Sequence, residues 1–468
     1  MEFSSANFVF FFLPVVFLLH LVLPWKQVRN GLLIVASLVF YAWGEPVYVL
    51  LMLLSAIFNY GLALFIDGSN GRKIKKALLI FSIVVNIGVL AALKYSAFVI
   101  ETLCGILPVN IAVPKTPSPL GISFFTFQAI SYIVDTYRTS VKPTKNFFRF
   151  LLYISFFGQL VQGPIIRYAS IEKQLDARRL TAENVAEGFR LFIIGLGMKL
   201  VIANTLGRVT GQIFSMDASR LNAAYAWVGA ICFLFQIYFD FAGYSQMAIG
   251  IGRAFGFTIP KNFDHPYVSR SITEFWRRWH ITLSAWFRDY VYIPLGGNRK
   301  GAFRTGVNKI IVFLLTGLWH GANWTYVVWG AYNGAFLLVE NYTKNCRLKI
   351  PGLLKWFFTI IAVTVGFVIF NSPDIGYALH MIKSMFTGFG IQAGTAAELS
   401  ALIKPTVMAT LATAAVAATP LAQNALKRLG KDSPIAAVIR YGSALLLLVI
   451  CIFYIANGNY NPSIYTKF

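Results

Sequence analysis

The sequence predicts an all-α protein that crosses a membrane several times. Of its 468 residues, 57% are hydrophobic and 13% are charged, whereas soluble globular proteins carry roughly 25% charged residues. Uncharged, mostly apolar runs occupy residues 8–23, 31–44 and 47–66. Runs of about 20 apolar residues are long enough to span the hydrocarbon core as helices.

The first run, residues 8–23, indicates a retained helix and not a cleaved signal peptide. Residues 1–10 carry Glu2 as their one charge, so a basic n-region is missing, and no small-residue cleavage site follows the run. Over the whole chain we expect roughly ten to twelve membrane-embedded segments. We also expect a single embedded domain, residues 1–468, because no repeat or low-complexity linker divides the chain.

The net charge of +23, from 41 basic and 18 acidic residues, has two interpretations. In a soluble protein it would suggest binding to nucleic acid. In a membrane protein, Lys and Arg gather on cytoplasmic loops, and basic clusters at residues 26–29, 72–76 and 138–149 fit that pattern. We therefore expect the N-terminus outside, contacts with membrane lipids and no nucleic-acid partner. The four cysteines, among them Cys346, are scattered without a CxxC pair, which argues against a disulfide framework or a cysteine metal site.

Two stretches depart from plain spanning helices. Phe147–Tyr168 is basic at both ends and contains Gly163-Pro164, so it suggests a re-entrant segment interrupted at that dipeptide. Gly121–Tyr137 mixes Ser, Thr and Gln into an apolar helix, which predicts a face packed against protein and not against lipid.

The segment Arg253–Lys309 carries ten basic and three acidic residues, a balance of +7. Its centre, SITEFWRRWHITLSAWFRDYVY, predicts one amphipathic helix over residues 271–292, lying in the membrane interface. The polar face of this helix would hold Thr273, Arg277, His280, Ser284 and Arg288. A purely structural role would explain the amphipathicity, but a histidine between two arginines on that face favours a site. We expect this face to be cytoplasmic.

The stretch Ile310–Val339 contains no Lys, Arg, Asp or Glu, and His320 is its one group that ionises near neutral pH. Ionisable side chains at membrane depth are costly and often functional, although a neutral histidine bonded to nearby backbone is the structural alternative. The small residues of GLWHGAN would allow another chain or a ligand to approach the imidazole. We find no HExxH, GxSxG or Walker A pattern, so a general base that deprotonates a hydroxyl during acyl transfer is the chemistry best suited to His320.

Five stretches resemble the membrane-bound O-acyltransferase (MBOAT) family, in particular its bacterial alginate O-acetyltransferase branch. They are PLGISFFTFQAISYIVDTYR (119–138), QGPIIRY (162–168), FDFAGYSQMAIGIGRAFGF (239–257), SRSITEFWRRWHITLSAWFRDYVYIPLGGNRKG (269–301) and GLWHGANWTYVVWGAYNG (317–334). The WRRWH and GLWHG elements are the most specific part. The resemblance covers residues 119–334 and leaves the chain beyond about Asn341 without a recognised motif.

The resemblance implies a ring of helices around a thin core, with a central tunnel through the membrane. It also implies acetyl-CoA as a cytoplasmic donor substrate, with no permanently bound cofactor and no metal. The acceptor would be an exported polysaccharide such as alginate or cellulose, reached through a periplasmic, SGNH-like partner protein. The expected location is the bacterial inner membrane.

The family's catalytic histidine corresponds to His320, and the second, branch-typical histidine corresponds to His280. The resemblance and the polar face together suggest eight further residues for donor or substrate binding: Arg277, Arg288, Asp289, Asn298, Arg299, Ser284, Trp319 and Asn323.

Two other functions remain open from the sequence. One is a different reaction of the same family, such as D-alanylation of teichoic acid or O-acetylation of peptidoglycan. The other is a transporter without chemistry, which would retain transport after His320→Ala.

Overall fold

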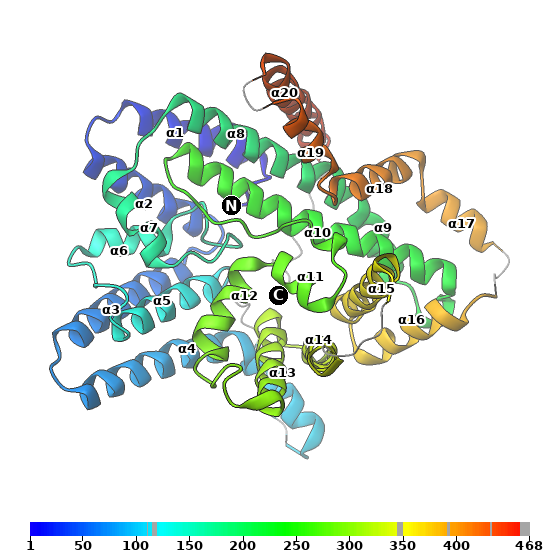
Figure 1. Ribbon diagram of the computed structural model, residues 1–468, viewed down its shortest axis with the longest axis horizontal. Coiled ribbons are helices and arrows are strands. Elements are labelled where there is room, and N and C mark those ends of the chain that lie inside the picture. Colours follow the sequence, from blue (N-terminus) through cyan, green and yellow to red (C-terminus); the bar gives the residue numbers. More distant parts are fainter. Residues whose placement is uncertain (110, 115–118, 344–349, 391–393, 431–432, 459–468) are drawn as a thin grey trace. The chain divides into compact units, whose positions relative to one another are not determined.

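The computed structural model describes residues 1–468 except 110, 115–118, 344–349, 391–393, 431–432 and 459–468. The described part of the chain is helical and contains no strand, which confirms the predicted all-α class (Figure 1). Cys346, which the sequence predicts to take no part in a disulfide framework or a metal site, lies outside the described residues.

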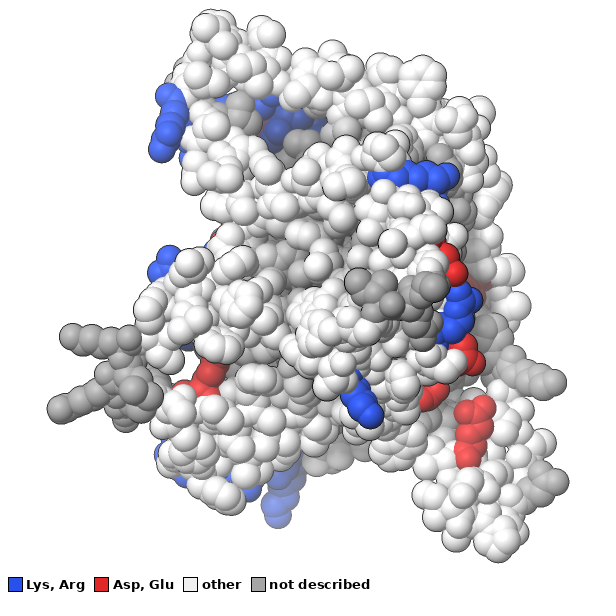
Figure 2. Space-filling model, turned by 90° about the vertical axis from the view of Figure 1, so that its right-hand side faces the viewer, with Lys and Arg blue, Asp and Glu red and all other residues white. Residues whose placement is uncertain are grey.

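Within the described residues, six helices are long and apolar enough to cross a membrane: α3 (Tyr48–Gly68), α4 (Arg72–Ile106), α10 (Ala223–Ala254), α13 (Gly301–His320), α15 (Gly352–Asn371) and α20 (Pro434–Ala456). The bent pair α17 (Thr395–Leu402) and α18 (Pro405–Ala417) would make a seventh span. The sequence estimate is higher because it counts runs such as 8–23 and 31–44, where the structure has the shorter helical stretches Asn7–Val22 and Lys26–Ala42. Figure 2 shows a face on which uncharged residues predominate, as expected of a protein surrounded by lipid.

The helices gather into two compact units, so the single domain 1–468 stays a prediction. The first unit comprises Met1–Phe192 and Ser245–Pro260. Besides α3 and α4, it contains η1 (Asn7–Phe12), α1 (Leu13–Val22), α2 (Lys26–Ala42), α5 (Ile122–Tyr137), α6 (Phe147–Ser155), α7 (Tyr168–Ala177), most of α8 (Ala182–Gly197) and the end of α10.

Helix α5 confirms the prediction that Gly121–Tyr137 faces protein, because nearly all of its residues are buried. Nearby, α3 and α4 are joined by paired amides: Asn59 Nδ2 donates to Asn86 Oδ1 at 3.1 Å, and Asn86 Nδ2 donates to Asn59 Oδ1 at 2.8 Å. Such hydrogen bonds hold helices together where lipid removes the hydrophobic driving force.

In the stretch Phe147–Tyr168, the helix α6 ends at Ser155, well before the expected break at Gly163-Pro164. With nine residues, α6 is too short to span a bilayer, which needs about 20. A re-entrant course for this segment stays a prediction.

The second unit comprises Ile193–Tyr244 and Lys261–Lys467. Besides most of α10 and the helices α13, α15, α17, α18 and α20, it contains η2 (Met198–Ala203), α9 (Asn204–Phe214), η3 (Ala218–Arg220), η4 (Pro266–Val268), α11 (Ile272–Arg278), α12 (Ile281–Phe287), η5 (Arg288–Tyr292), α14 (Trp324–Thr343), α16 (Ile375–Thr387) and α19 (Leu421–Arg428). Both histidines singled out by the sequence belong to this unit.

The uncharged stretch Ile310–Val339 folds as two packed helices, α13 and α14, that meet at residues 321–323 (Figure 1). Glycines permit their close approach: a Cβ at Gly317 would collide with the Tyr326 carbonyl, and one at Gly330 with the Phe313 carbonyl. A Cβ at Gly321 would likewise meet the Tyr326 ring. The small residues around His320 therefore let another part of the chain approach. Tyr326 fills the space beside Gly317 and Gly321, so that space is not left for reactants.

Candidate active site

The segment that carries His280 is broken, so the single helix predicted for residues 271–292 is wrong. Helix α11 ends before Trp279, α12 starts after His280, and the π-helical turn η5 follows. At His280 the backbone φ is 45°, in the left-handed region that non-glycine residues rarely adopt. Strain of this kind costs about 1–3 kcal/mol and is concentrated at functional sites.

The His280 imidazole is buried among aromatic rings and one amide. Its Nδ1 lies 3.2 Å from Oδ1 of Asn262, and its ring packs edge-to-face against Phe241 at a centroid distance of 4.6 Å. Burial lowers the pKa of His280 to about 3, so the ring is neutral at physiological pH.

His320 is the last residue of α13, and its side chain is buried, as the sequence predicted for a site histidine. Two rings meet its imidazole edge-to-face, Trp329 and Phe370, each at a centroid distance of 5.1 Å. Packing against these two rings restricts rotation of the imidazole.

Trp319 contacts both imidazoles. Its ring centroid lies 4.8 Å from that of His320 and 5.9 Å from that of His280. The structure therefore brings the two predicted catalytic residues to one indole, although they come from separate segments of the chain.

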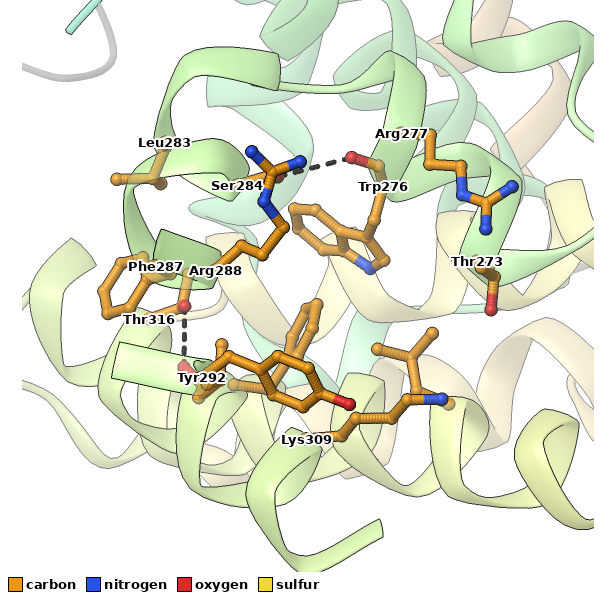
Figure 3. A pocket seen from close by; sticks show the side chains of 13 residues that line it. Thr273, Trp276, Arg277, Leu283, Ser284, Phe287, Arg288, Tyr292, Lys309 and Thr316 are labelled. Atoms are coloured by element: carbon orange, nitrogen blue, oxygen red, sulfur yellow. Dashed lines mark hydrogen bonds between the residues drawn. The ribbon is translucent and has the colours of Figure 1, made fainter. Parts of the chain in front are cut away.

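A cavity of about 240 Å³ lies between the α11–η5 segment and α13 (Figure 3). Its walls are mostly apolar, with Trp276 and Phe313 among them, and three cationic residues also line it: Arg277, Arg288 and Lys309. Ser284 lines it as well, and its hydroxyl donates to the Trp276 carbonyl at 3.3 Å. Three donor-binding candidates thus meet at one cavity, while His280, displaced by the turn in the backbone, does not line it.

The α13 wall of this cavity leads toward His320. Lys309, Val312, Phe313 and Thr316 line the cavity at helical spacing, and His320 follows Thr316 by one turn on the same face. The cavity lining ends at Thr316, and His320 lies one helical turn beyond it at the end of α13.

The other candidates lie outside the cavity lining. Asp289 binds the neighbouring Arg288, with Arg288 Nε donating to Asp289 Oδ1 at 2.6 Å and Nη2 donating to Oδ2 at 3.1 Å. Asn298 and Arg299 are exposed in the turn after η5. Asn323 accepts from the Thr325 N–H at 3.0 Å and donates to the Pro373 carbonyl at 3.1 Å, so its contacts cap α14 and tie it to the segment after α15.

Sequence reasoning missed two residues of α14 that hold α11 in place. The Glu340 carboxylate accepts from the Ile272 and Thr273 N–H groups at 2.6 and 2.9 Å. It thereby satisfies two of the N–H groups that have no partner within α11 at its N-terminus. Asn333 Oδ1 accepts from Trp276 Nε1 at 3.2 Å. The available signal was Glu340 itself, an acidic residue directly after a long uncharged run.

A buried ion pair was missed as well. Lys199 Nζ lies 2.6 Å from Asp240 Oδ1, and both side chains are almost fully buried between η2 and α10. Charged residues inside apolar helices usually pair with one another, so the isolated Lys and Asp were a usable signal.

Residues 136–379 match the model of the MBOAT, membrane-bound O-acyltransferase, family. The matched region includes both histidines and every residue that lines the cavity.

The chain is also similar over most of its length to curated proteins. The probable alginate O-acetylase AlgI of Pseudomonas aeruginosa is 41% identical to it over 83% of this chain and 75% of the relative. The protein of the same name from Pseudomonas putida is 38% identical over 100% of both chains. The peptidoglycan O-acetyltransferase of Helicobacter pylori is 36% identical over 82% of this chain and 79% of the relative.

Proposed function

Because the chain belongs to the membrane-bound O-acyltransferase family and is a multi-pass membrane enzyme, we propose that it transfers acetyl groups from acetyl-CoA to hydroxyls of an exported polysaccharide. Membership of an acyltransferase family sets aside the alternative of a transporter without chemistry. The proposal concerns the donor, the acceptor and the partner.

The observation that carries the proposal is the cation-lined cavity whose α13 wall leads to His320. Arginines bind phosphates well, which suits the phosphates of coenzyme A. The cavity, at about 240 Å³, is smaller than the roughly 300–1,000 Å³ of typical ligand pockets. It would therefore take the thioester end of the donor, with the nucleotide outside it, near exposed Arg277.

The reaction assigns one role to His320. Its neutral imidazole takes the proton of the acceptor hydroxyl as the oxygen attacks the thioester carbonyl carbon. The new C–O bond forms, the C–S bond breaks, and the imidazolium returns the proton to the departing thiolate. No permanently bound cofactor or metal takes part in this scheme.

Alginate or a similar polymer is the proposed final acceptor, supported by the names of the Pseudomonas relatives. A periplasmic, SGNH-like protein would receive or direct the acetyl group on the outer side of the bacterial inner membrane. The Helicobacter relative supports peptidoglycan as a second candidate acceptor.

The test is transfer from labelled acetyl-CoA by the purified full chain in lipid vesicles. Alginate oligosaccharides, peptidoglycan fragments and a D-alanyl carrier thioester would be compared, each with and without a candidate periplasmic partner. We expect label on the polysaccharide, and we expect His320→Gln to abolish it. Transfer of D-alanine in place of acetyl would overturn the proposed donor, and transfer to peptidoglycan alone would replace the acceptor.

The proposed donor side can be tested separately. The basic segment should face the cytoplasm, so Asn298→Cys, in a background whose four native cysteines are replaced, should react with an impermeant thiol reagent from that side. Labelling from the periplasmic side only would contradict a cytoplasmic donor.

A further inference from the structure

Asn262 was not singled out by the sequence, yet its side chain binds the segment that carries His280. Its Oδ1 accepts from the Thr282 N–H at 3.2 Å and from the Thr282 hydroxyl at 2.9 Å. Its backbone carbonyl accepts from the Ile281 N–H at 2.9 Å. Asn262 is fully buried and thereby satisfies two N–H groups at the start of α12.

These contacts determine which atom of the amide faces His280. A backbone N–H can only donate, so the Asn262 atom bonded to Thr282 N is the carbonyl oxygen and not the amide nitrogen. The same oxygen lies 3.2 Å from Nδ1 of His280. Because an amide oxygen can only accept, Nδ1 must carry the proton of the neutral ring.

The other ring nitrogen, Nε2, is then left with a free lone pair. Nε2 is buried and has no hydrogen-bond partner among the residues that the structure describes. Phe241 meets the ring edge-to-face and Phe263 stacks near it at a centroid distance of 6.4 Å, so the imidazole cannot easily turn over. A buried nitrogen without a partner is costly unless a ligand or substrate group satisfies it.

We propose that Asn262 is a positioning residue that holds His280 in the Nδ1–H tautomer, so that Nε2 accepts a hydrogen bond from a hydroxyl-bearing substrate. The inference rests on the proposed function for the identity of that substrate. It assigns His280 an accepting role: a neutral ring in this tautomer can receive a proton at Nε2 but cannot donate one to an oxyanion.

The tautomer can be measured without any assay of activity. Solid-state NMR of the full chain with ¹⁵N-labelled histidine gives distinct shifts for protonated and bare ring nitrogens. The chain has five histidines, and the His280 signals are assigned by their loss in His280→Gln. We expect Nδ1 protonated and Nε2 bare in the wild type and in Asn262→Asp, which keeps the accepting oxygen. In Asn262→Leu we expect both tautomers.

Thr282→Val is the matched control, because it removes a second donor to the same oxygen and leaves the contact with His280 intact. This variant should keep the wild-type tautomer. An Nε2–H form of His280 in the wild type, or an unchanged tautomer in Asn262→Leu, would overturn the proposal.

Steady-state kinetics test whether the orientation of His280 affects acetyl transfer. Loss of a group that orients a catalytic histidine can cost as much as about 10⁴-fold in rate, and for a neutral amide we expect about tenfold or more in kcat. The KM for acetyl-CoA should change little in Asn262→Leu, and Asn262→Asp should restore much of the rate. If His280→Gln stays fully active while the tautomer is as expected, the catalytic use of His280 fails but the positioning by Asn262 stands.

Discussion

The two walls of the candidate site are built by different means. The α11–α12 wall is broken and strained at His280, and individual polar groups hold it: Asn262 at the break and Glu340 at the start of α11. The α13–α14 wall consists of two regular helices that fit by shape, through Gly317 and Gly330. The first wall should therefore respond to the loss of single hydrogen bonds, and the second to changes in volume.

The largest expected effect lies on the shape-built wall, which carries His320, the proposed general base. His320→Gln should reduce acetyl transfer by about a hundred- to ten-thousand-fold, because glutamine keeps size and hydrogen bonding but cannot act as a base. Transfer would be measured in membranes with matched expression levels. Near-wild-type turnover would remove the general-base role and make His280 the next candidate.

A test of shape itself is Gly330→Ala. The new Cβ would meet the Phe313 backbone, and overpacking of this kind costs about 1–3 kcal/mol in free energy of unfolding. Thermal unfolding in detergent would measure the loss. Gly211→Ala on α9 is the control, since a Cβ there meets nothing within 4 Å; equal destabilisation by both changes would show that close helix packing is not the cause.

On the polar wall, Arg277→Ala should weaken acetyl-CoA binding by about tenfold, the effect of one charge-assisted hydrogen bond. Binding of labelled donor to the purified protein would measure it. Arg208→Ala is the matched control, because Arg208 is an exposed arginine of α9 that neither lines the cavity nor belongs to the candidate donor site. An unchanged affinity in Arg277→Ala would remove this residue from the donor site.

The smallest effect concerns acid stability. Burial lowers the pKa of His280 to about 3, whereas an unfolded histidine titrates near 6.5, so the unfolded chain binds more protons between these values. Stability is therefore complete above pH 6.5 and falls as the pH drops toward 3, by about 1 kcal/mol at pH 6. Thermal unfolding at pH 7.5 and pH 6 should show a smaller loss for His280→Gln than for the wild type. An equal loss in both would indicate that His280 is not buried.

The sequence predicted the α13–α14 wall, which is held together by shape, better than the α11–α12 wall, which is held by polar groups. An uncharged run with one histidine is a local signal, and His320 is buried at the site it suggested. Helical periodicity placed Arg277, Ser284 and Arg288 together, and they do share a cavity. The same periodicity could not foresee the left-handed turn at His280, where the contacts are made with Asn262, a loop residue eighteen positions away.

Other residues were misjudged for equally physical reasons. Asn323 follows the histidine motif in sequence, but its hydrogen bonds go to a helix start and to Pro373. The role of Glu340 depends on a contact across 67 residues of chain, which no local pattern reveals.

Helix α14 contacts both ends of the candidate site and fixes the distance between them. Near its start, Trp329 lies against His320, and near its end, Glu340 accepts a hydrogen bond from the first turn of α11. Arg277 belongs to the last turn of the same helix. The eleven residue steps from Trp329 to Glu340 rise about 16 Å at 1.5 Å per residue. Since a helix resists stretching, the length of α14 sets the separation between the α11 segment that carries Arg277 and the His320 imidazole. If Arg277 binds the donor as proposed, a donor whose arm does not match this separation would place its reactive carbon away from the imidazole.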